Sequence, residues 1–240
     1  MNILITLCGR GGSKGIPGKN IKKLNEIPLL AYSIMHAKEF AKANGNSNID
    51  IILSTDDRNI KDVASSYDLE TEYIRPDYLA NDSVGKIEVL KDALEFQENQ
   101  FQKKYDILLD LDLTSPLRTQ KDLNEGLEKL LLDENAINLF SVSKPHKNPY
   151  FNVVEDSGNG YCKLVCPSDT RSRQTAPKVF DMNASFYFYR RTFFENNCKS
   201  AITARSLYYV MDHICFDLDE PLDFDIMEYL LKNNKLGMTI

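Results

Sequence analysis

The sequence has no excess of positive charge and no long apolar run, and each absence excludes a class of protein. Its 240 residues carry 29 Lys and Arg against 35 Asp and Glu, a formal net charge of −6, whereas nucleic-acid binders usually show a basic excess. No run approaches the ~18 apolar residues of a membrane span, and the run at residues 3–7 is shorter than the ~7 to 15 residues of a secretion signal. We therefore expect a cytoplasmic protein that binds neither nucleic acid nor membranes.

Cysteines are few, and low-complexity segments, internal repeats and linkers are missing. The cysteines are scattered, and no second pair completes a zinc site, so reduced, mostly buried thiols are expected. With 42% hydrophobic and 27% charged residues the composition is that of an ordinary globular protein. The length suits a single domain over residues 1–240. The five cysteines are Cys8, Cys162, Cys166, Cys198 and Cys215.

Strand-like and helix-like segments alternate through the first half of the chain. Continuous β-prone runs alternate with apolar residues at helical spacing, and the connections are short. This alternation is typical of a mostly parallel sheet covered by helices on both faces. The strands are expected at 3–7, 49–54, 72–74 and 106–111, and the helices at 28–43, 55–67, 84–99 and 121–132.

From residue 137 the pattern changes to short extended segments with turn signals. Residues 156–160 are a plausible hairpin turn between two of them. We interpret residues from about 143 to 190 as a small β-rich insertion whose exposed part serves a second subunit, so a homodimer is expected. The extended segments are 139–142, 151–155, 161–165 and 186–189, and a last helix is expected at 222–233.

The charges are distributed unevenly. Residues 1–25 contain five basic residues and no acid, whereas residues 206–231 contain seven acids and neither Lys nor Arg. The basic segment includes a glycine-rich loop directly after the first strand, where open α/β sheets bind their ligands. Small residues let backbone N–H groups approach a phosphate, and the cations can neutralise several negative charges. A polyphosphate is the expected ligand.

Two familiar phosphate-binding motifs do not fit this loop. A Walker loop needs glycine at position 13 and Ser or Thr at position 20, where the chain has Ser13 and Asn20. The Rossmann motif GxGxxG would start at Gly9 and place Lys14 where its third glycine belongs.

Residues 9–20 closely resemble the signature of the acylneuraminate cytidylyltransferases, the CMP-sialic acid synthetases, which usually begins Ala-Arg. Its final Lys19-Asn20 separates it from the Kdo cytidylyltransferases, whose loop typically ends Lys-Pro. The resemblance implies a three-layer Rossmann-like nucleotide-diphospho-sugar transferase fold, α/β with a mainly parallel mixed sheet and a small β-rich insertion. Further blocks in the family's order are 54–57, 75–76 with 79–82, 114–118, 173–174, 183 with 186–187, and 217–219 with 223–224.

The resemblance also implies a reaction in which the 2-hydroxyl of a nonulosonic acid attacks the α-phosphorus of CTP and pyrophosphate leaves. Asp217 and Asp219 lie two apart at an expected strand end, which points both carboxylates to one side, and their hard oxygens suit Mg²⁺ (or Mn²⁺). By resemblance, the catalytic cations are Lys19, Arg10 and Lys14; the nucleotide-binding residues are Gly11, Gly12, Ser13, Asn20, Arg75 and Asp82; and the sugar-binding residues are Asp112, Thr114, Ser115, Arg173, Gln174, Asn183 and Tyr187.

Three departures from the family's pattern concern the sugar pocket. Asp112 stands where these enzymes commonly carry a glutamine that touches the sugar, and a carboxylate accepts hydrogen bonds but cannot donate them. Lys199 and Ser200 follow Cys198 where the dimeric sialate enzymes place two aromatics on the partner's segment, and Lys86 stands where a nucleotide-contacting serine often lies. We expect a sugar with a donor such as an N–H, preferably a legionaminic-acid type with a second acylamido group. The alternative is that Asp112 holds an ordered water.

Other functions stay open at this stage. The same chemistry on N-acetylneuraminate, pseudaminate or Kdo is the first alternative. A metal-dependent glycosyltransferase using Asp110 and Asp112 as its metal motif would bind a preformed nucleotide sugar and release no pyrophosphate. A non-catalytic nucleotide-binding module would bind CTP without turnover.

Overall fold

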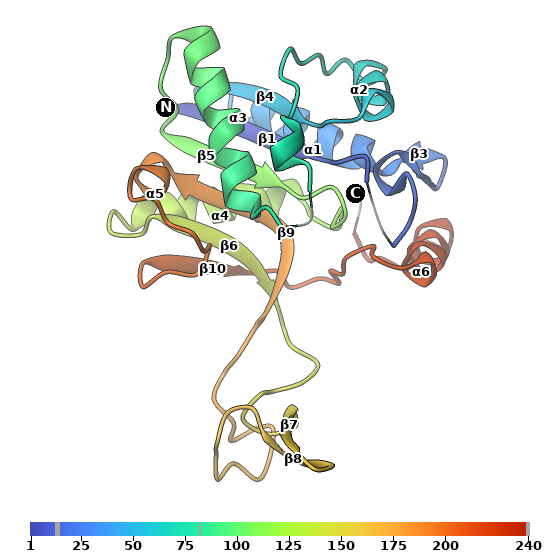
Figure 1. Ribbon diagram of the computed structural model, residues 1–240, viewed down its shortest axis with the longest axis vertical. Helices are drawn as coiled ribbons and strands as arrows, with labels where there is room; N and C mark the ends of the chain where they lie inside the picture. The colour runs from blue at the N-terminus through green and yellow to red at the C-terminus, as the bar shows by residue number, and fades with distance from the viewer. Residues whose placement is uncertain (13–14, 82, 239–240) are drawn as a thin grey trace.

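A six-stranded mixed sheet forms the centre of the computed structural model, which describes residues 1–12, 15–81 and 83–238 (Figure 1). The strand order is β10-β6-β9-β5-β1-β4, and all neighbours pair in parallel except β9, which runs antiparallel to both β5 and β6. The expected mainly parallel mixed sheet is thus confirmed. The strands are β1 (Asn2–Cys8), β4 (Asn48–Ser54), β5 (Ile107–Leu111), β6 (Asn138–Ser143), β9 (Asp181–Arg190) and β10 (Ser206–Val210).

Helices cover both faces of the sheet because successive side chains of a strand point to opposite sides. Ile3 and Ile5 of β1 pack with α1, α2 and α4, whereas Leu4 packs with α3 and α5 on the other face. The arrangement has three layers. The helices are α1 (Leu29–Ala43), α2 (Arg58–Ser65), α3 (Lys86–Phe101), α4 (Gln120–Leu132) and α5 (Arg191–Glu195).

A third apolar cluster holds the two ends of the chain together. Ile16 and Leu24, which follow the glycine-rich loop, are buried with Leu218 and with Phe224 and Met227 of α6 (Pro221–Lys232). The acidic C-terminal segment is thereby packed beside the basic N-terminal one. The short elements here are η1 (Lys19–Ile21), β2 (Lys23–Leu24) and β3 (Ile27–Pro28); η2 (Asp77–Leu79) precedes α3.

The strand order places a switch point between β1 and β5. The chain leaves β1 for β4 on one side and then crosses to β5 on the other. At such a reversal the connections leave in opposite directions, so a crevice opens outside the carboxyl ends of the two strands. Cys8 and Leu111 end these strands and therefore border that crevice.

Residues 144–180 form an arm that leaves the body between β6 and β9 (Figure 1). Its far end carries a two-stranded hairpin of β7 (Val154–Gly158) and β8 (Tyr161–Leu164). Gly158, Asn159 and Gly160 all have positive φ (93°, 56° and 80°), as a tight hairpin turn requires, so the turn expected from the sequence is present. The rest of the expected insertion, 181–190, is strand β9 of the central sheet.

Several element predictions were wrong. Residues 72–74 form no strand; the chain there lies beside the end of β4, where the Arg75 N–H donates to the Thr55 carbonyl at 3.0 Å. The strand expected at 151–155 begins at Val154 instead, because Phe151 and Asn152 turn back and donate to the Asn148 carbonyl. Strand β10 and helix α5 had not been predicted at all. None of the helices in the described part of the chain combines the length and apolar character that a membrane span requires.

Candidate active site

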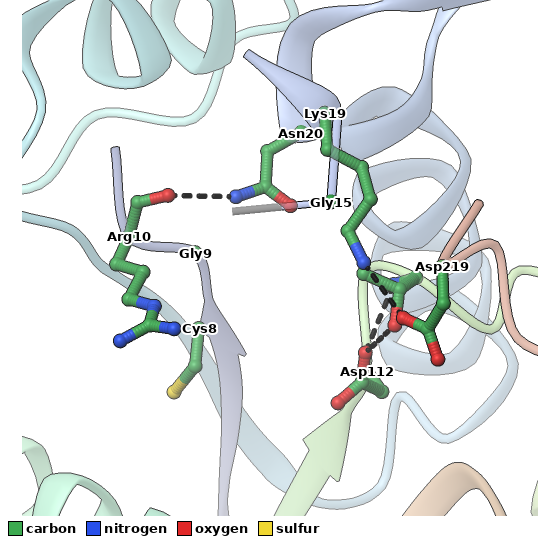
Figure 2. Close-up of a pocket in the computed structure, with 9 residues that line it drawn as sticks. Cys8, Gly9, Arg10, Gly15, Lys19, Asn20, Asp112 and Asp219 are labelled. Atoms are coloured by element: carbon green, nitrogen blue, oxygen red, sulfur yellow. Dashed lines mark hydrogen bonds and ion pairs between the residues drawn. The ribbon is translucent and has the colours of Figure 1, made fainter. Parts of the chain in front are cut away.

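A cavity of ≈ 410 Å³ lies at the switch point, outside the carboxyl ends of β1 and β5 (Figure 2). Arg10 comes from one wall, and Lys19 with Asp219 comes from the opposite wall. Six of the residues predicted from the sequence therefore share one pocket. Its lining is Cys8, Gly9, Arg10, Gly15, Lys19, Asn20, Asp112, Thr114 and Asp219.

Backbone contacts fix the glycine-rich loop over β1 and β4. The Gly9 N–H donates to the Ser54 carbonyl at 3.0 Å, and the Gly11 N–H donates to an Asp56 carboxylate oxygen at 3.1 Å. The buried Asn20 donates its side-chain amide to the Arg10 carbonyl at 3.0 Å. Asn20 thus holds the loop itself through one N–H of its amide, which leaves its oxygen and its second N–H for a ligand.

The acidic segment touches this loop at Asp219. Lys19 Nζ lies 2.9 Å from Asp219 Oδ1, with Lys19 13% and Asp219 70% exposed. A Cβ added to Gly15 would come within 2.6 Å of the Asp219 carbonyl oxygen, so the two backbones meet where only glycine fits. Leu218 also donates its N–H to the Thr114 carbonyl at 2.9 Å. Asp219 therefore contacts the phosphate loop through its side chain and its backbone.

The expectation that Asp217 and Asp219 lie at a strand end was wrong. They lie in an irregular extended segment before α6 and are held by a helix cap: Asp223 Oδ2 accepts from the N–H groups of Asp219 and Glu220 at 2.9 and 2.7 Å. The acids around residue 220 thus partly serve to start the helix.

Asp217 has the character of a cation ligand. Its Oδ1 is buried without a hydrogen-bond partner among the described residues. Burial, helped by the charges of Asp112 and Asp219, raises the pKa of Asp217 from 3.8 to about 6, although Ser115 and Lys19 act the other way. A divalent cation would satisfy the orphaned oxygen and remove the repulsion between the carboxylates. No group of three or more potential ligands occurs within the residues described, so the remaining ligands would be phosphate oxygens and water.

Asp112 is tied into a polar cluster on the α3 face of the sheet. Its Oδ1 accepts from the backbone N–H and the hydroxyl of Thr114, both at 2.9 Å, and its Oδ2 lies 3.2 Å from Lys86 Nζ. Lys86 Nζ also lies 3.1 Å from Oδ2 of the fully buried Asp110, whose Oδ1 accepts from Thr6 at 2.8 Å. Asp110 and Asp112 thus share an ammonium group, which argues against the metal motif of a glycosyltransferase.

The charges in this cluster are set by Lys86. Burial opposes its charge, but the two carboxylates outweigh burial and hold the pKa of Lys86 well above its ordinary value. Burial tends to raise the pKa of Asp112, yet Lys86 and Thr114 bring it below the usual range. For Asp110, burial dominates and its pKa is raised. Tyr187, beside Asp110 in the register of the sheet, has a pKa raised to about 12 by burial and by both carboxylates.

Ser115 and Asn183 do not line the cavity but form a hydrogen bond with each other. The buried Ser115 hydroxyl donates to the Asn183 carbonyl at 2.8 Å. The side chain of Asn183 donates to Ser143 Oγ at 2.7 Å and accepts from Ser141 Oγ at 2.6 Å. Both residues join the end of β5 to β9 and thereby position Asp112 and Thr114.

The remaining residues that were predicted to bind the nucleotide or the sugar do not line the cavity or lie outside the described residues. Arg75 is buried beside the end of β4, where its Nε and Nη2 donate to Ser54 Oγ and the Ser54 carbonyl at 3.0 and 2.7 Å. Arg173 and Gln174 belong to the arm, where Arg173 donates to the His146 carbonyl at 2.9 Å, and the arm extends away from the central sheet (Figure 1). Ser13, Lys14 and Asp82 lie outside the described residues.

Lys86 and Gly15 belong to the site, although neither had been given a role from the sequence. Lys86 had been noted only as a departure from the family's pattern, since nothing in the sequence indicates that it reaches Asp110 and Asp112. Gly15 is one glycine among several in the loop, and its approach to Asp219 depends on residues about two hundred positions away.

Comparisons with known proteins agree with this geometry. A family model described as cytidylyltransferase matches residues 5–232. The chain is 39% identical over 236 residues to the CMP-N,N'-diacetyllegionaminic acid synthase of Campylobacter jejuni, covering 98% of this chain and 97% of that one. It is 38% identical over 234 residues to the post-translational flagellin modification protein B of Campylobacter coli, with the same coverage. A solved CMP:2-keto-3-deoxy-manno-octonic acid synthetase complexed with CTP has the same fold, with a TM-score of 0.68 at 15% identity over 98% of this chain and 100% of that chain.

Proposed function

The chain belongs to the cytidylyltransferase family, and we propose that it activates a nonulosonic acid with CTP, giving the CMP-sugar and pyrophosphate. The preferred sugar is N,N'-diacetyllegionaminic acid or a similar acid, as in the relative from Campylobacter jejuni. The observation that carries the proposal is the meeting of the phosphate loop and the acidic segment, through Lys19 and Asp219, at the switch point of the sheet.

Positioning and charge neutralisation are what this chemistry needs most. Arg10, Lys14 and the loop amides would hold the β and γ phosphates, and Lys19 would lie at the α-phosphate, where negative charge develops during attack. Arg75 would hold the cytosine from the end of β4. The sugar would then occupy the β5 side of the cavity, beside Asp112 and Thr114.

Asp217 and Asp219 would hold a divalent cation, Mg²⁺ or Mn²⁺. The fit rests on the buried, unpartnered Oδ1 of Asp217 and on the short distance in sequence to the exposed Asp219. When bound, such an ion withdraws charge from the α-phosphate and lowers the pKa of the attacking hydroxyl. Lys19 would then exchange its ion pair with Asp219 for a contact to the phosphate.

A homodimer is part of the proposal. The arm exposes apolar side chains: Val154, Tyr161 and Val165 are 57%, 76% and 41% exposed. It also carries Arg173 and Gln174, neither of which lines the cavity of its own chain. A partner whose pocket receives this arm would bury the apolar residues and gain Arg173 for the carboxylate of the sugar. The expected cytoplasmic location stays a prediction.

The test is CTP-dependent pyrophosphate release against a panel of N,N'-diacetyllegionaminate, N-acetylneuraminate, pseudaminate and Kdo. We expect release that requires both CTP and a nonulosonic acid, with the highest kcat/KM on the diacetyl sugar. Absence of release with every sugar would refute the proposal, and preference for plain N-acetylneuraminate would refute the choice of substrate.

A further inference from the structure

Lys86 and Asp112 leave one donor and one acceptor for a ligand. An ammonium has three N–H donors: one is donated to Asp112 Oδ2, and the side that faces Asp110 Oδ2 is taken up by an ion pair at 3.1 Å that is not a hydrogen bond. Of the four acceptor positions of the Asp112 carboxylate, Thr114 takes two and Lys86 takes one. One N–H of Lys86 and one lone pair of Asp112 therefore stay free of the protein contacts just named.

Both groups are accessible, whereas the third member of the cluster is not. The side chains of Lys86 and Asp112 are 38% and 23% exposed, and Asp112 lines the cavity. Asp110 is fully buried, and its carboxylate forms an ion pair with Lys86 Nζ from the protein interior. Lys86 comes from the first turn of α3 and Asp112 follows β5, so two packed elements fix the donor beside the acceptor.

The charge of the cluster does not favour an anionic ligand group. The ammonium of Lys86 is shared by two carboxylates, so the cluster has no excess positive charge to attract the phosphates or the sugar's carboxylate. A neutral group with hydrogen-bonding capacity suits it better. An acylamido group supplies an N–H donor on one atom and a carbonyl acceptor on another, and a trans amide points these two in opposite directions. One amide therefore cannot satisfy Lys86 and Asp112 together, but two neighbouring amides can.

We propose that Lys86 and Asp112 form a specificity-determining pair for a sugar with two acylamido groups: Asp112 accepts the N–H of one, and Lys86 donates to the carbonyl oxygen of the other. This inference rests on the proposed function. It explains both departures from the family's sequence pattern, at positions 86 and 112, by recognition of the two acylamido groups. Asp110 is a positioning residue, because it acts only through Lys86. A hydroxyl in place of the second acylamido group can also accept a hydrogen bond, but its oxygen lies two bonds closer to the sugar carbon than the carbonyl oxygen does, so it does not reach Lys86 from the same position.

The experiment compares kcat/KM of wild type and Lys86→Met for N,N'-diacetyllegionaminate and for N-acetylneuraminate, with KM for CTP measured in both proteins. We expect Lys86→Met to lose roughly 10- to 100-fold on the diacetyl sugar, as for the loss of one charged hydrogen bond in a buried site. N-acetylneuraminate should change less than about threefold, so the preference for the diacetyl sugar collapses, while KM for CTP stays constant. Lys86→Arg, which keeps a charged donor, should retain part of the preference.

Lys91→Met is the matched control, since it makes the same change further along α3 at a residue whose side chain pairs with Glu95 and Asn197. Because Lys86→Met leaves Asp110 and Asp112 unpaired, the double variant Lys86→Met with Asp110→Asn removes the buried charge if the single variant does not fold. An equal loss on both sugars, or a rise in KM for CTP, would overturn the inference. Absence of turnover by wild type with every sugar would instead mean that the proposed function has failed.

Discussion

Lys19 Nζ and Asp219 Oδ1 lie 2.9 Å apart, although 200 positions separate the two residues in the chain. The pair joins the basic N-terminal loop to the acidic C-terminal segment at the mouth of the cavity. An exposed ion pair of this kind contributes only about 0–1 kcal/mol to stability. The Lys19–Asp219 pair therefore matters less for stability than for the position in which it holds the two charges at the cavity.

Lys19→Met should reduce kcat by roughly 10²- to 10³-fold, because a preorganised cation at the α-phosphate is lost. The melting temperature should change little, since Asp219 is 70% exposed and stays solvated. Steady-state pyrophosphate release and thermal denaturation measure the two effects. A variant with normal kcat would show that Lys19 does not act on the phosphate.

The raised pKa of Asp217 predicts that the stability of the metal-free protein depends on pH, and that Mg²⁺ restores the stability lost at higher pH. Because the pKa of Asp217 is raised from 3.8 to about 6, the folded protein binds more protons than the unfolded chain between these values. The stability of the metal-free protein should therefore fall as the pH rises from about 4 to 6, and Mg²⁺ should restore it above pH 6. Thermal denaturation with and without Mg²⁺ at several pH values measures both.

Asp217→Asn should stabilise the metal-free protein at pH 7 and abolish the rise in melting temperature with Mg²⁺. Asp225→Asn is the control, because it removes the same charge from an exposed position on α6. If Mg²⁺ raises the melting temperature of Asp217→Asn as much as that of wild type, Asp217 is not a ligand.

Gly15→Ala tests the contact between the phosphate loop and the acidic segment. Its Cβ would lie within 2.6 Å of the Asp219 carbonyl oxygen, so one of the two backbones must move. We expect a loss of at least about tenfold in kcat/KM, because displacement of positioned groups by about 1 Å can cost as much as 10²-fold. Gly45→Ala, which meets only an ordinary contact at 3.6 Å, should keep full activity, and equal activities would contradict the account.

Arg118 should determine the shape of the segment that carries Asp112. It is fully buried and donates to the carbonyls of Asp112 and Ser115 and to the hydroxyls of Ser33 and Ser185. Burial lowers the pKa of Arg118 to about 10, so it stays charged at neutral pH. Arg118→Met leaves these acceptors unpaired.

The free energy of unfolding of Arg118→Met should fall by about 3 kcal/mol, as several buried acceptors lose their donor. Chemical denaturation measures this loss. Lys121→Met, an exposed residue paired with Glu125 on α4, should stay within about 0.5 kcal/mol of wild type. A similarly small effect of Arg118→Met would mean that the segment holds its shape without Arg118.

Subunit mixing tests the proposed dimer. Lys19→Met inactivates the pocket of its own chain, whereas Arg173→Ala would affect the pocket of the partner. Co-refolding of the two inactive variants should restore activity, to about a quarter of wild type under random pairing, because half of the dimers are mixed and each mixed dimer has one intact pocket. No recovery in mixed dimers would place Arg173 outside the partner's site.

The sequence predicted the architecture well where the signal was local. The continuous apolar run at 3–7 and the glycines and cations after it indicate a buried strand and a phosphate loop, and both are present as β1 and the loop at the cavity. The edge strand β10 was missed because its half-exposed residues alternate weakly and its pairing with β6 is long-range.

The parts of the site that could not be predicted depend on contacts between distant residues. Lys86 of α3 meets Asp112 on one face of the sheet, and its role is invisible until α3 is placed over β5. Asp217 and Asp219 were assigned to a strand end because alternation suggests it, but a helix cap holds them instead. Asn20 and Asn183, expected at ligands, also have structural partners that no local pattern reveals.

The central claim is the transfer of a cytidylyl group to a nonulosonic acid, and the most direct measurement identifies the products. CTP labelled in the cytosine ring is incubated with N,N'-diacetyllegionaminate and Mg²⁺, and the products are resolved by mass spectrometry. The account predicts one CMP-sugar for each pyrophosphate released, with none formed when the sugar or Mg²⁺ is omitted. Consumption of CTP without a CMP-sugar, or transfer of sugar from a preformed nucleotide sugar instead, would contradict it.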